Sequence, residues 1–211
     1  MSFSPGEWSL YLCTPIREDL VEFVTACVLG GVGVVQLRDK DHGDRDLLHA
    51  AEQLATSCRT LGVPFIVNDR CDVALAVGAD GVHVGQDDLP VRRCRELLGD
   101  DAIVGLSTHA PGELDAGIAA PVSYLSAGPV EATPTKPGRP GTGVDYAAGA
   151  ARRAPVPVYV TGGVTTATIP GLVAAGLRHF VVVRALTEAS DPRGAARSLA
   201  DAVGGAVAAA T

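Results

Sequence analysis

The sequence has few aromatic residues and lacks the features that mark several classes of protein. Phenylalanine, tryptophan and tyrosine together make up 4% of its 211 residues. The longest tempting uncharged run, residues 24–37, is shorter than the ~20 residues of a spanning helix, and glycines interrupt it. The formal net charge of −7 argues against nucleic acid or an anionic membrane as the main partner. Residues 1–7 contain no basic region followed by an apolar one, so we expect no secretory signal.

The five cysteines also lack a recognisable pattern. They form no CxxC pair, their number is odd, and most stand among apolar neighbours. We therefore expect buried, reduced thiols in a cytoplasmic protein rather than disulfides or metal ligands.

What the sequence does contain is a series of short, valine-rich apolar runs. Hydrophobic residues make up 47% of the chain, enough for one domain over residues 1–211 to bury a substantial core. Near-continuous apolar runs between helical segments are typical of strands buried on both faces of a parallel sheet. The runs are Leu10–Cys13, Val32–Leu37, Pro64–Val67, Gly81–Val84, Ala102–Leu106, Val122–Ala127, Val156–Val160 and His179–Val183.

The clearest helix is predicted over Asp44–Leu61, which is apolar on one face and is followed by Gly62 at the C′ position. Pro90 and Pro111 are predicted to lie in the first turns of later helices. Eight strands, each followed by a helical segment, indicate an α/β fold of the single-domain (β/α)8 TIM-barrel type. A doubly wound open sheet is the alternative, because strand counts from periodicity are imprecise.

Polar residues end the second run at alternating positions. In extended backbone Gln36, Arg38 and Lys40 point to one side while Leu37 points away. One amide and two cations at this spacing could hold a phosphate and the edge of an amide-like heterocycle. The alternative is a charged loop start that binds nothing.

Carboxylates follow the third and fourth runs. Asp69 comes directly after Asn68, and Asp88 lies in the segment after Val84. Such a pair suits Mg²⁺, which takes one or two carboxylates and completes its shell with waters and substrate phosphate oxygens. Because Asp88 precedes the helix expected at Pro90, helix capping is the alternative for that residue.

The fifth run ends in a hydroxyl and is soon followed by a histidine. Ser107 would face the barrel mouth if Leu106 faces outward. His109 could shuttle a proton, but we favour a place at the N-terminus of the next helix. No acid and nucleophile stand at a recognisable spacing from it, which argues against a hydrolytic triad. His83, inside an apolar run, is expected to be a hydrogen-bonded core residue rather than a ligand.

Two loops are candidate anion sites. Gly128–Lys136 contains two prolines, which stiffen it, and two threonines and a lysine, which can reach an anion; an ordinary connector is the alternative. Gly162 and Gly163 end the seventh run, and Arg184 follows the eighth. TIM barrels often bind phosphate there through backbone N–H groups. Two anion sites and a metal site at one face indicate a transferase that joins two phosphorylated small molecules.

Five motifs in series resemble those of the thiamine phosphate synthases, and they extend over nearly the whole chain. They are Val35-Gln-Leu-Arg-Asp-Lys40, Val67-Asn-Asp-Arg70, Gly81-Val-His-Val-Gly-Gln-Asp-Asp88, Gly128-Pro-Val with Thr133-Pro-Thr-Lys136, and Gly162-Gly163. The resemblance implies a TIM-type barrel that joins 4-amino-2-methyl-5-hydroxymethylpyrimidine diphosphate to 4-methyl-5-(2-phosphooxyethyl)thiazole. The products would be thiamine phosphate and pyrophosphate, in thiamine biosynthesis.

The resemblance also implies roles for individual residues. The pyrimidine diphosphate would be held by Gln36, Arg38, Lys40, Asn68 and Ser107, with Lys136 on its phosphates. Mg²⁺ would be held by Asp69 and Asp88, and the thiazole phosphate by Thr133, Thr135, Gly163, Val183 and Arg184. Catalysis would rest on Lys136, Ser107 and Arg38. The family's mechanism is dissociative: the carbon–oxygen bond ionises, and the thiazole nitrogen then captures the pyrimidine cation without a general base.

Some alternatives stay open. A related thiazole tautomerase shares the fold and the thiazole-phosphate pocket but transfers a proton, often with a histidine near position 109. That enzyme would not need Lys136 together with Asp69 and Asp88. A non-catalytic barrel that binds thiazole phosphate is a third possibility. Arg184 stands where the family usually has serine, so the role of its side chain is open, as is assembly into a homo-oligomer.

Overall fold

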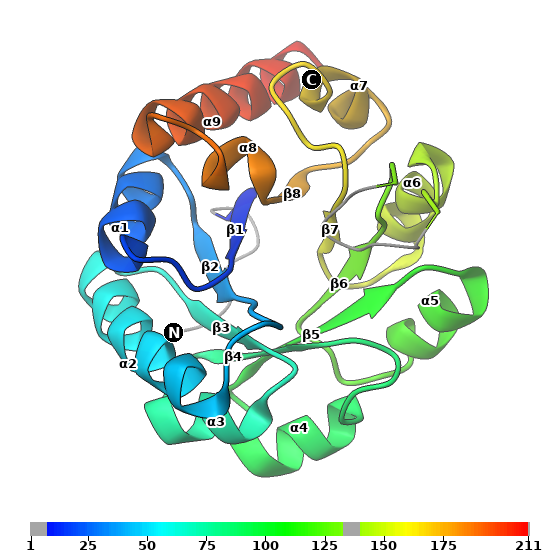
Figure 1. Cartoon of the computed structure of the whole chain (residues 1–211). Helices are drawn as coiled ribbons and strands as arrows, with labels where there is room; N and C mark the ends of the chain where they lie inside the picture. The colour runs from blue at the N-terminus through cyan, green and yellow to red at the C-terminus, as the bar shows by residue number, and fades with distance from the viewer. Residues whose placement is uncertain (1–7, 133–139, 211) are drawn as a thin grey trace.

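The computed structural model describes residues 8–132 and 140–210, which form a closed barrel of eight parallel strands inside a ring of helices (Figure 1). The strands are β1 (Leu10–Thr14), β2 (Val34–Leu37), β3 (Phe65–Asn68), β4 (Gly81–Val84), β5 (Ile103–Thr108), β6 (Tyr124–Ala127), β7 (Val158–Val160) and β8 (His179–Val182). The helices are α1 (Leu20–Gly30), α2 (Asp44–Leu61), α3 (Cys71–Val77), α4 (Val91–Leu98), α5 (Pro111–Ile118), α6 (Val144–Arg153), α7 (Ile169–Ala174), α8 (Arg184–Thr187) and α9 (Pro192–Ala209). Each strand pairs with the next along the chain, and β8 pairs with β1.

The predicted TIM barrel is therefore confirmed, and the open sheet is excluded. Each predicted run overlaps one strand, although several strands begin later than their runs. Helix α2 has the predicted bounds, and Gly62 ends it with a φ of 72°, in the left-handed region that glycine adopts readily. Pro111 opens α5 as predicted, whereas Pro90 is the N-cap of α4, just before its first turn.

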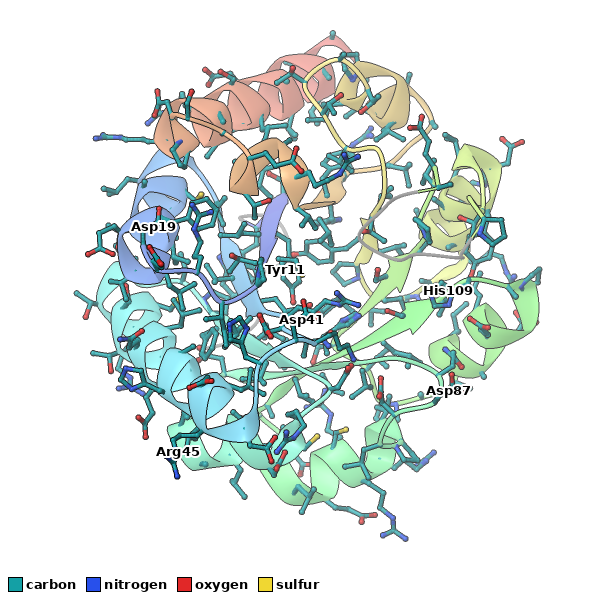
Figure 2. All side chains as sticks on the ribbon, in the orientation of Figure 1. Tyr11, Asp19, Asp41, Arg45, Asp87 and His109 are labelled. Carbon is teal, nitrogen blue, oxygen red and sulfur yellow. The ribbon has the colours of Figure 1, made fainter. Side chains whose placement is uncertain are left out.

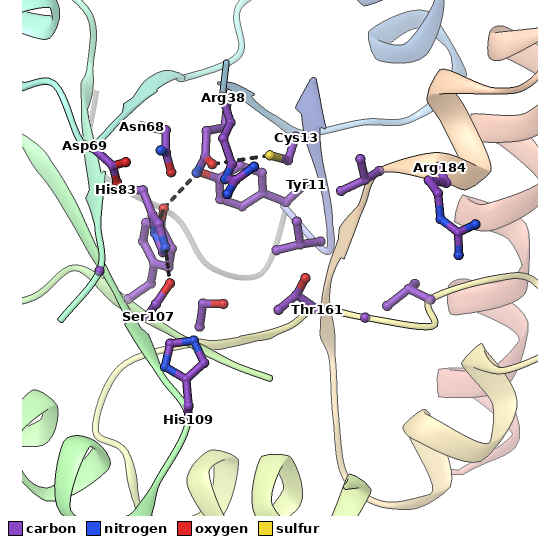
Figure 3. Close-up of a pocket in the computed structure, with 18 of the residues that line it drawn as sticks. Tyr11, Cys13, Arg38, Asn68, Asp69, His83, Ser107, His109, Thr161 and Arg184 are labelled. Carbon is purple, nitrogen blue, oxygen red and sulfur yellow. Dashed lines mark hydrogen bonds between the residues drawn. The ribbon is translucent and has the colours of Figure 1, made fainter. Parts of the chain in front are cut away.

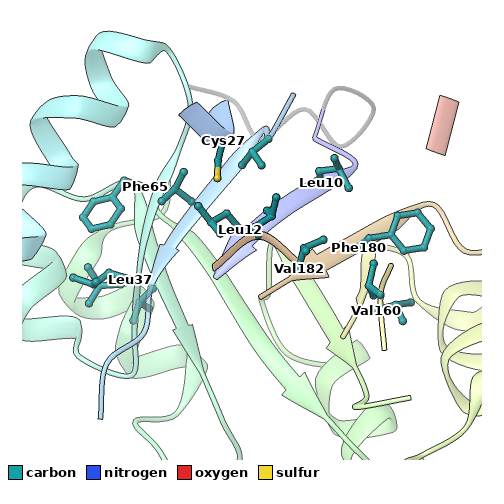
Figure 4. Packing of buried hydrophobic residues seen from close by; sticks show 14 of the residues in the cluster. Leu10, Leu12, Cys27, Leu37, Phe65, Val160, Phe180 and Val182 are labelled. Carbon is teal, nitrogen blue, oxygen red and sulfur yellow. The ribbon is translucent and has the colours of Figure 1, made fainter. Parts of the chain in front are cut away.

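Between the strands and the helices lies the larger of the two apolar cores formed by the described residues. Its members include the outward-facing side chains of Leu12, Leu37, Phe65 and Phe180, packed together with Cys27 of α1 (Figure 4). These strand side chains are at most 1% exposed. This packing is why the runs are apolar throughout: one face of each strand meets helices, while the other meets the barrel interior.

The barrel interior holds a cluster of aromatic residues. Tyr11, Tyr124 and Tyr159 pack against one another there, with ring centroids 5.2–5.8 Å apart and edge-on geometry. Trp8 lies in the same cluster. Figure 2 shows Tyr11 near the barrel axis, whereas Arg45 lies at the periphery. Three of the four tyrosines thus fill the inside of the barrel, whereas Phe23, Phe65 and Phe180 belong to the outer core.

Gly105 of β5 makes room for this interior cluster. A Cβ at this position would lie 2.1 Å from Cζ of Tyr124 and 2.6 Å from Nδ1 of His83. Both distances are shorter than carbon and nitrogen tolerate, so the large side chains of β4 and β6 meet only because β5 has glycine between them.

All five cysteines are buried and free of disulfides, as predicted. Burial raises the pKa of Cys27 and Cys58 to about 12, so these thiols stay protonated at neutral pH. Over residues 8–132 and 140–210, no helix has both the length and the hydropathy to cross a membrane.

Candidate active site

A cavity of about 400 Å³ opens at the carboxyl end of the strands, where a TIM barrel carries its active site (Figure 3). Every predicted site residue within the described ranges lines it. These residues are Gln36, Arg38, Lys40, Asn68, Asp69, Asp88, Ser107, Gly163, Val183 and Arg184. The remaining predicted residues, Thr133, Thr135 and Lys136, lie outside the described residues.

The floor of the cavity is a chain of buried hydrogen bonds. Nε2 of Gln36 donates to the hydroxyl of Tyr11 at 2.7 Å, and the hydroxyls of Tyr11 and Tyr124 are 2.8 Å apart. Nδ1 of His83 lies 2.9 Å from the Tyr124 hydroxyl, and its Nε2 lies 2.8 Å from Oγ of Ser107. Residues of β1, β2, β4, β5 and β6 are thereby connected (Figure 3).

Gln36 donates to the first hydroxyl of this chain. The two tyrosine hydroxyls and the imidazole of His83 can each donate and accept, so the remaining bonds can run in either direction. Burial raises the pKa of Tyr11 and Tyr124, so both phenols remain protonated donors.

The prediction that His83 is a hydrogen-bonded core residue is confirmed, but it left out that His83 also lines the cavity. The residue is 8% exposed and paired on both ring nitrogens, and it also lines the cavity. Cys13 likewise lines the cavity, and its thiol donates to Oε1 of Gln36 at 3.4 Å, which fixes the orientation of that amide.

Three charged residues meet above one side of the floor. The ammonium of Lys40, after β2, contacts the carboxylate of Asp69, after β3. Asp69 has a φ of 61°, and its N–H donates to the carbonyl of His83 at 2.8 Å. Burial raises the pKa of Asp69, Lys40 opposes that effect, and the neighbouring Asp88 carboxylate adds to it. A left-handed backbone at a non-glycine residue is strained, and such strain is typical of functional positions.

Asp88 does not cap a helix. Its carboxylate accepts the N–H of Gly85 at 2.7 Å, and α4 has no side-chain cap. Asp69 and Asp88 are thus two neighbouring carboxylates whose repulsion a divalent cation would relieve, and carboxylate oxygens are the ligands that Mg²⁺ prefers. No group of three histidine, cysteine or acidic side chains suited to a metal occurs within 8–132 and 140–210. These two residues fit an ion whose remaining ligands are water and substrate.

Asp39 organises the loop that carries Lys40, a role that sequence reasoning missed. Its carboxylate accepts the N–H groups of Ile16, Asp41 and His42 at 2.8–3.0 Å. Burial alone would raise the pKa of Asp39, but these hydrogen bonds hold it below its usual value. The loop is therefore held in place by an ionised carboxylate.

The opposite side of the cavity is formed by glycine backbone, with the charged side chain of Arg184 at its rim. Gly162 and Gly163 have φ values of 87° and 73° and adopt a turn that favours glycine. A Cβ on Gly163 would lie 2.7 Å from Oε2 of Glu131, and one on Gly162 would lie 2.5 Å from Cβ of Pro129. The loops after β6 and β7 therefore pack closely. Figure 3 shows Arg184, the exposed first residue of α8, at the rim on this side.

His109 lies beside the start of α5, as we favoured, and a role in proton transfer stays a prediction. It precedes α5, and it also lines the cavity. Its Nδ1 lies 3.0 Å from Oε2 of Glu113, which also accepts its backbone N–H at 2.7 Å. Sequence reasoning missed Glu113, although the four-residue spacing across a helix start was a signal for it.

Comparison with known proteins agrees with this geometry. A family model described as thiamine monophosphate synthase matches residues 10–186. A thiamine-phosphate synthase of Thermobifida fusca is 49% identical over 196 residues, which cover 90% of this chain and 89% of that one. One from Mycobacterium sp. strain JLS is 44% identical over 208 residues, covering 92% of each chain. One from Thermosynechococcus vestitus is 43% identical over 190 residues, and there the chain spans about half, 54%, of the relative's length.

Solved structures show the same relationship. A thiamine phosphate pyrophosphorylase from Pyrococcus furiosus superposes with a TM-score of 0.87 at 27% identity, covering 96% of this chain and 98% of that one. A 3-hexulose-6-phosphate synthase covers 92% of this chain and 99% of its own, with a TM-score of 0.69 at 19% identity, a likeness of fold alone. The resemblance seen in the sequence motifs is thereby confirmed, and the chain belongs to the thiamine monophosphate synthase family.

Proposed function

We propose that the protein transfers the hydroxymethylpyrimidine group of 4-amino-2-methyl-5-hydroxymethylpyrimidine diphosphate to 4-methyl-5-(2-phosphooxyethyl)thiazole. The products are thiamine phosphate and pyrophosphate. The observation that carries this proposal is a single cavity with a hydrogen-bonding floor, a cationic and acidic side, and a glycine turn opposite. A heterocycle, a metal-bound diphosphate and a phosphate monoester each require one of these three surfaces.

The floor suits the pyrimidine. Gln36 offers an amide and Ser107 a hydroxyl at the two ends of the hydrogen-bond chain. Both can bond the nitrogen-rich edges of a heterocycle, and the network behind them limits their movement, so little entropy is lost on binding. Asn68 lines the same side and adds a further amide.

The charged side suits the diphosphate. Arg38 and Lys40 supply cations, and we assign Lys136 to the same group. Asp69 and Asp88 would hold Mg²⁺. When bound, the ion would supply neutralisation of charge on the diphosphate oxygens.

The glycine turn suits the phosphate of the acceptor. Gly163 and the backbone at Val183 line this side, where N–H groups can approach an anion closely. We assign Thr133 and Thr135 to the same phosphate. The exposed Arg184 can add a charge-assisted contact at the rim in place of a neutral hydroxyl.

The reaction then needs charge stabilisation more than proton transfer. The bond between the pyrimidine methylene and the diphosphate oxygen breaks, and its electron pair leaves with the diphosphate. The lone pair of the thiazole nitrogen forms the new carbon–nitrogen bond, so no proton has to be removed. Arg38 and Lys136 would stabilise the departing diphosphate, and Ser107 would keep the pyrimidine aligned with the acceptor.

Two further properties belong to this proposal. The substrates are phosphorylated small molecules, and five free, buried thiols support a cytoplasmic location for their reaction. One continuous barrel supports treatment of residues 1–211 as one catalytic domain.

The test is direct. Purified protein given both substrates and Mg²⁺ should release one pyrophosphate for each thiamine phosphate formed. Absence of both products with authentic substrates and metal would overturn the proposal.

A second function, thiazole tautomerisation, is favoured by the His109–Glu113 pair at the cavity wall. A histidine held by a carboxylate is suited to proton transfer. The protein would then transfer a proton in the thiazole without releasing pyrophosphate, and His109→Ala would lose this activity.

A further inference from the structure

Lys40 stands where a metal ion would be expected. Its ammonium contacts Oδ2 of Asp69, one of the two carboxylates assigned to Mg²⁺. The side chain of Lys40 is 55% exposed, whereas that of Asp69 is 17% exposed. A flexible, hydrated cation therefore lies over a carboxylate that is largely enclosed by the barrel.

The two carboxylates are held more firmly than the ammonium. The backbone of Asp69 is tied to β4 through its N–H bond to His83, and the Asp88 carboxylate is tied to the N–H of Gly85. Lys40 ends a four-carbon stem that can swing between Asp69 and any anion arriving in the cavity. Of these partners, the lysine is the one free to change position.

We propose that Lys40 is an internal counter-ion that occupies the cation position on Asp69 until the diphosphate arrives. The metal then binds together with the diphosphate rather than before it. This inference rests on the proposed function, because it assumes a diphosphate substrate.

Charge balance gives the reason. Two carboxylates and one ammonium leave a net charge of −1 at this corner, so adding a divalent cation while the lysine stays would make it positive. A diphosphate reverses this: it attracts Lys40 toward its oxygens and leaves Asp69 to the metal. The exchange places each charge next to an opposite one in both states.

The test measures metal binding without substrates. Mn²⁺ replaces Mg²⁺, since both prefer oxygen ligands and free Mn²⁺ can be followed by electron paramagnetic resonance. Wild type is compared with Lys40→Met, which deletes the competing ammonium. We expect Lys40→Met to bind Mn²⁺ about fivefold more tightly, the upper end for competition by an exposed ion pair.

Arg70→Met is the matched control. Arg70 is adjacent to Asp69 in the chain and carries the same charge, but it pairs with Asp44 and Asp72, at 2.6 Å each. It should change Mn²⁺ affinity by less than about twofold, because its charge is already balanced. Asp69→Asn should abolish the gain when it is combined with Lys40→Met. Circular dichroism and thermal melting check that each variant folds.

Three results would overturn the inference. They are unchanged or weaker Mn²⁺ binding by Lys40→Met, no measurable binding by that variant, or an equal gain in Arg70→Met. An equal gain would reveal a long-range charge effect rather than occupation of the site. Product formation by wild type is measured separately, so failure of the counter-ion role is distinguishable from failure of the synthase assignment.

Discussion

The hydrogen-bond chain on the cavity floor predicts that the loss of one oxygen atom, the hydroxyl of Tyr124, will affect both stability and activity. Tyr124→Phe deletes the hydroxyl that bonds to both Tyr11 and His83, and it leaves the ring in place. The chain is then cut at its middle, with Gln36 on one side and Ser107 on the other. We expect the variant to be less stable and to use the pyrimidine diphosphate less efficiently.

The stability loss can be estimated from the two bonds. At about 1 kcal/mol for each buried hydrogen bond, the free energy of unfolding should fall by about 2 kcal/mol. In a chain of 211 residues this corresponds to a melting temperature lower by about 4–8 °C. Gln36 and Ser107 would each lose part of their support, so kcat/KM for the pyrimidine diphosphate should fall about tenfold.

Tyr159→Phe is the matched control for this variant. Tyr159 lies in the same buried cluster, but its hydroxyl donates to the carbonyl of Trp8 at 2.8 Å and belongs to no bond of the chain. It should lower the melting temperature by about 2–4 °C and leave kcat/KM nearly unchanged. Calorimetry and steady-state kinetics at saturating acceptor measure both quantities. Equal kinetic effects in the two variants would refute a positioning role for the chain.

Three other substitutions test separate parts of the structure. Asp69→Asn should retain the fold but lose turnover at limiting Mg²⁺, and wild-type turnover under that condition would rule out the metal role. Gly105→Ala would press a methyl group against Tyr124, so we expect a loss of about 1–3 kcal/mol in thermal unfolding; an unchanged melting temperature would contradict the packing argument. Asp39→Asn tests the pH dependence of stability. The pKa of Asp39 is lower in the folded protein than its unfolded value of about 3.9. The carboxylate therefore stabilises the fold above about pH 3.9, and this effect is lost as the pH falls through the folded pKa. The stability gap between wild type and Asp39→Asn should therefore be full at pH 6 and shrink below about pH 4, and a constant gap would show that ionisation is irrelevant.

The sequence was informative wherever a local pattern carries the structure. Alternation correctly separated Gln36, Arg38 and Lys40 from Leu37, because a strand sends successive side chains to opposite faces. The carboxyl ends of parallel strands meet at one face of a barrel, which brought Asp69 and Asp88 into the same cavity. Strand periodicity and strand order were sufficient to predict that these residues reach the cavity.

The cavity floor could not be predicted in this way. Tyr11 and Tyr124 are 113 positions apart and meet only because the barrel closes. Each lies in a run that is apolar on both faces, so periodicity does not reveal which side points inward. The need for glycine at position 105 is equally invisible, because it arises from side chains on the two neighbouring strands.

The aromatic floor also has a kinetic consequence. Tyr11 and Tyr124 line the cavity and pack with Tyr159 in the barrel interior, so the cavity is closed on this side by the described residues. A pyrimidine bound against this floor lies behind whatever occupies the rim. With the substrates placed as proposed, we expect the pyrimidine diphosphate to bind before the thiazole phosphate.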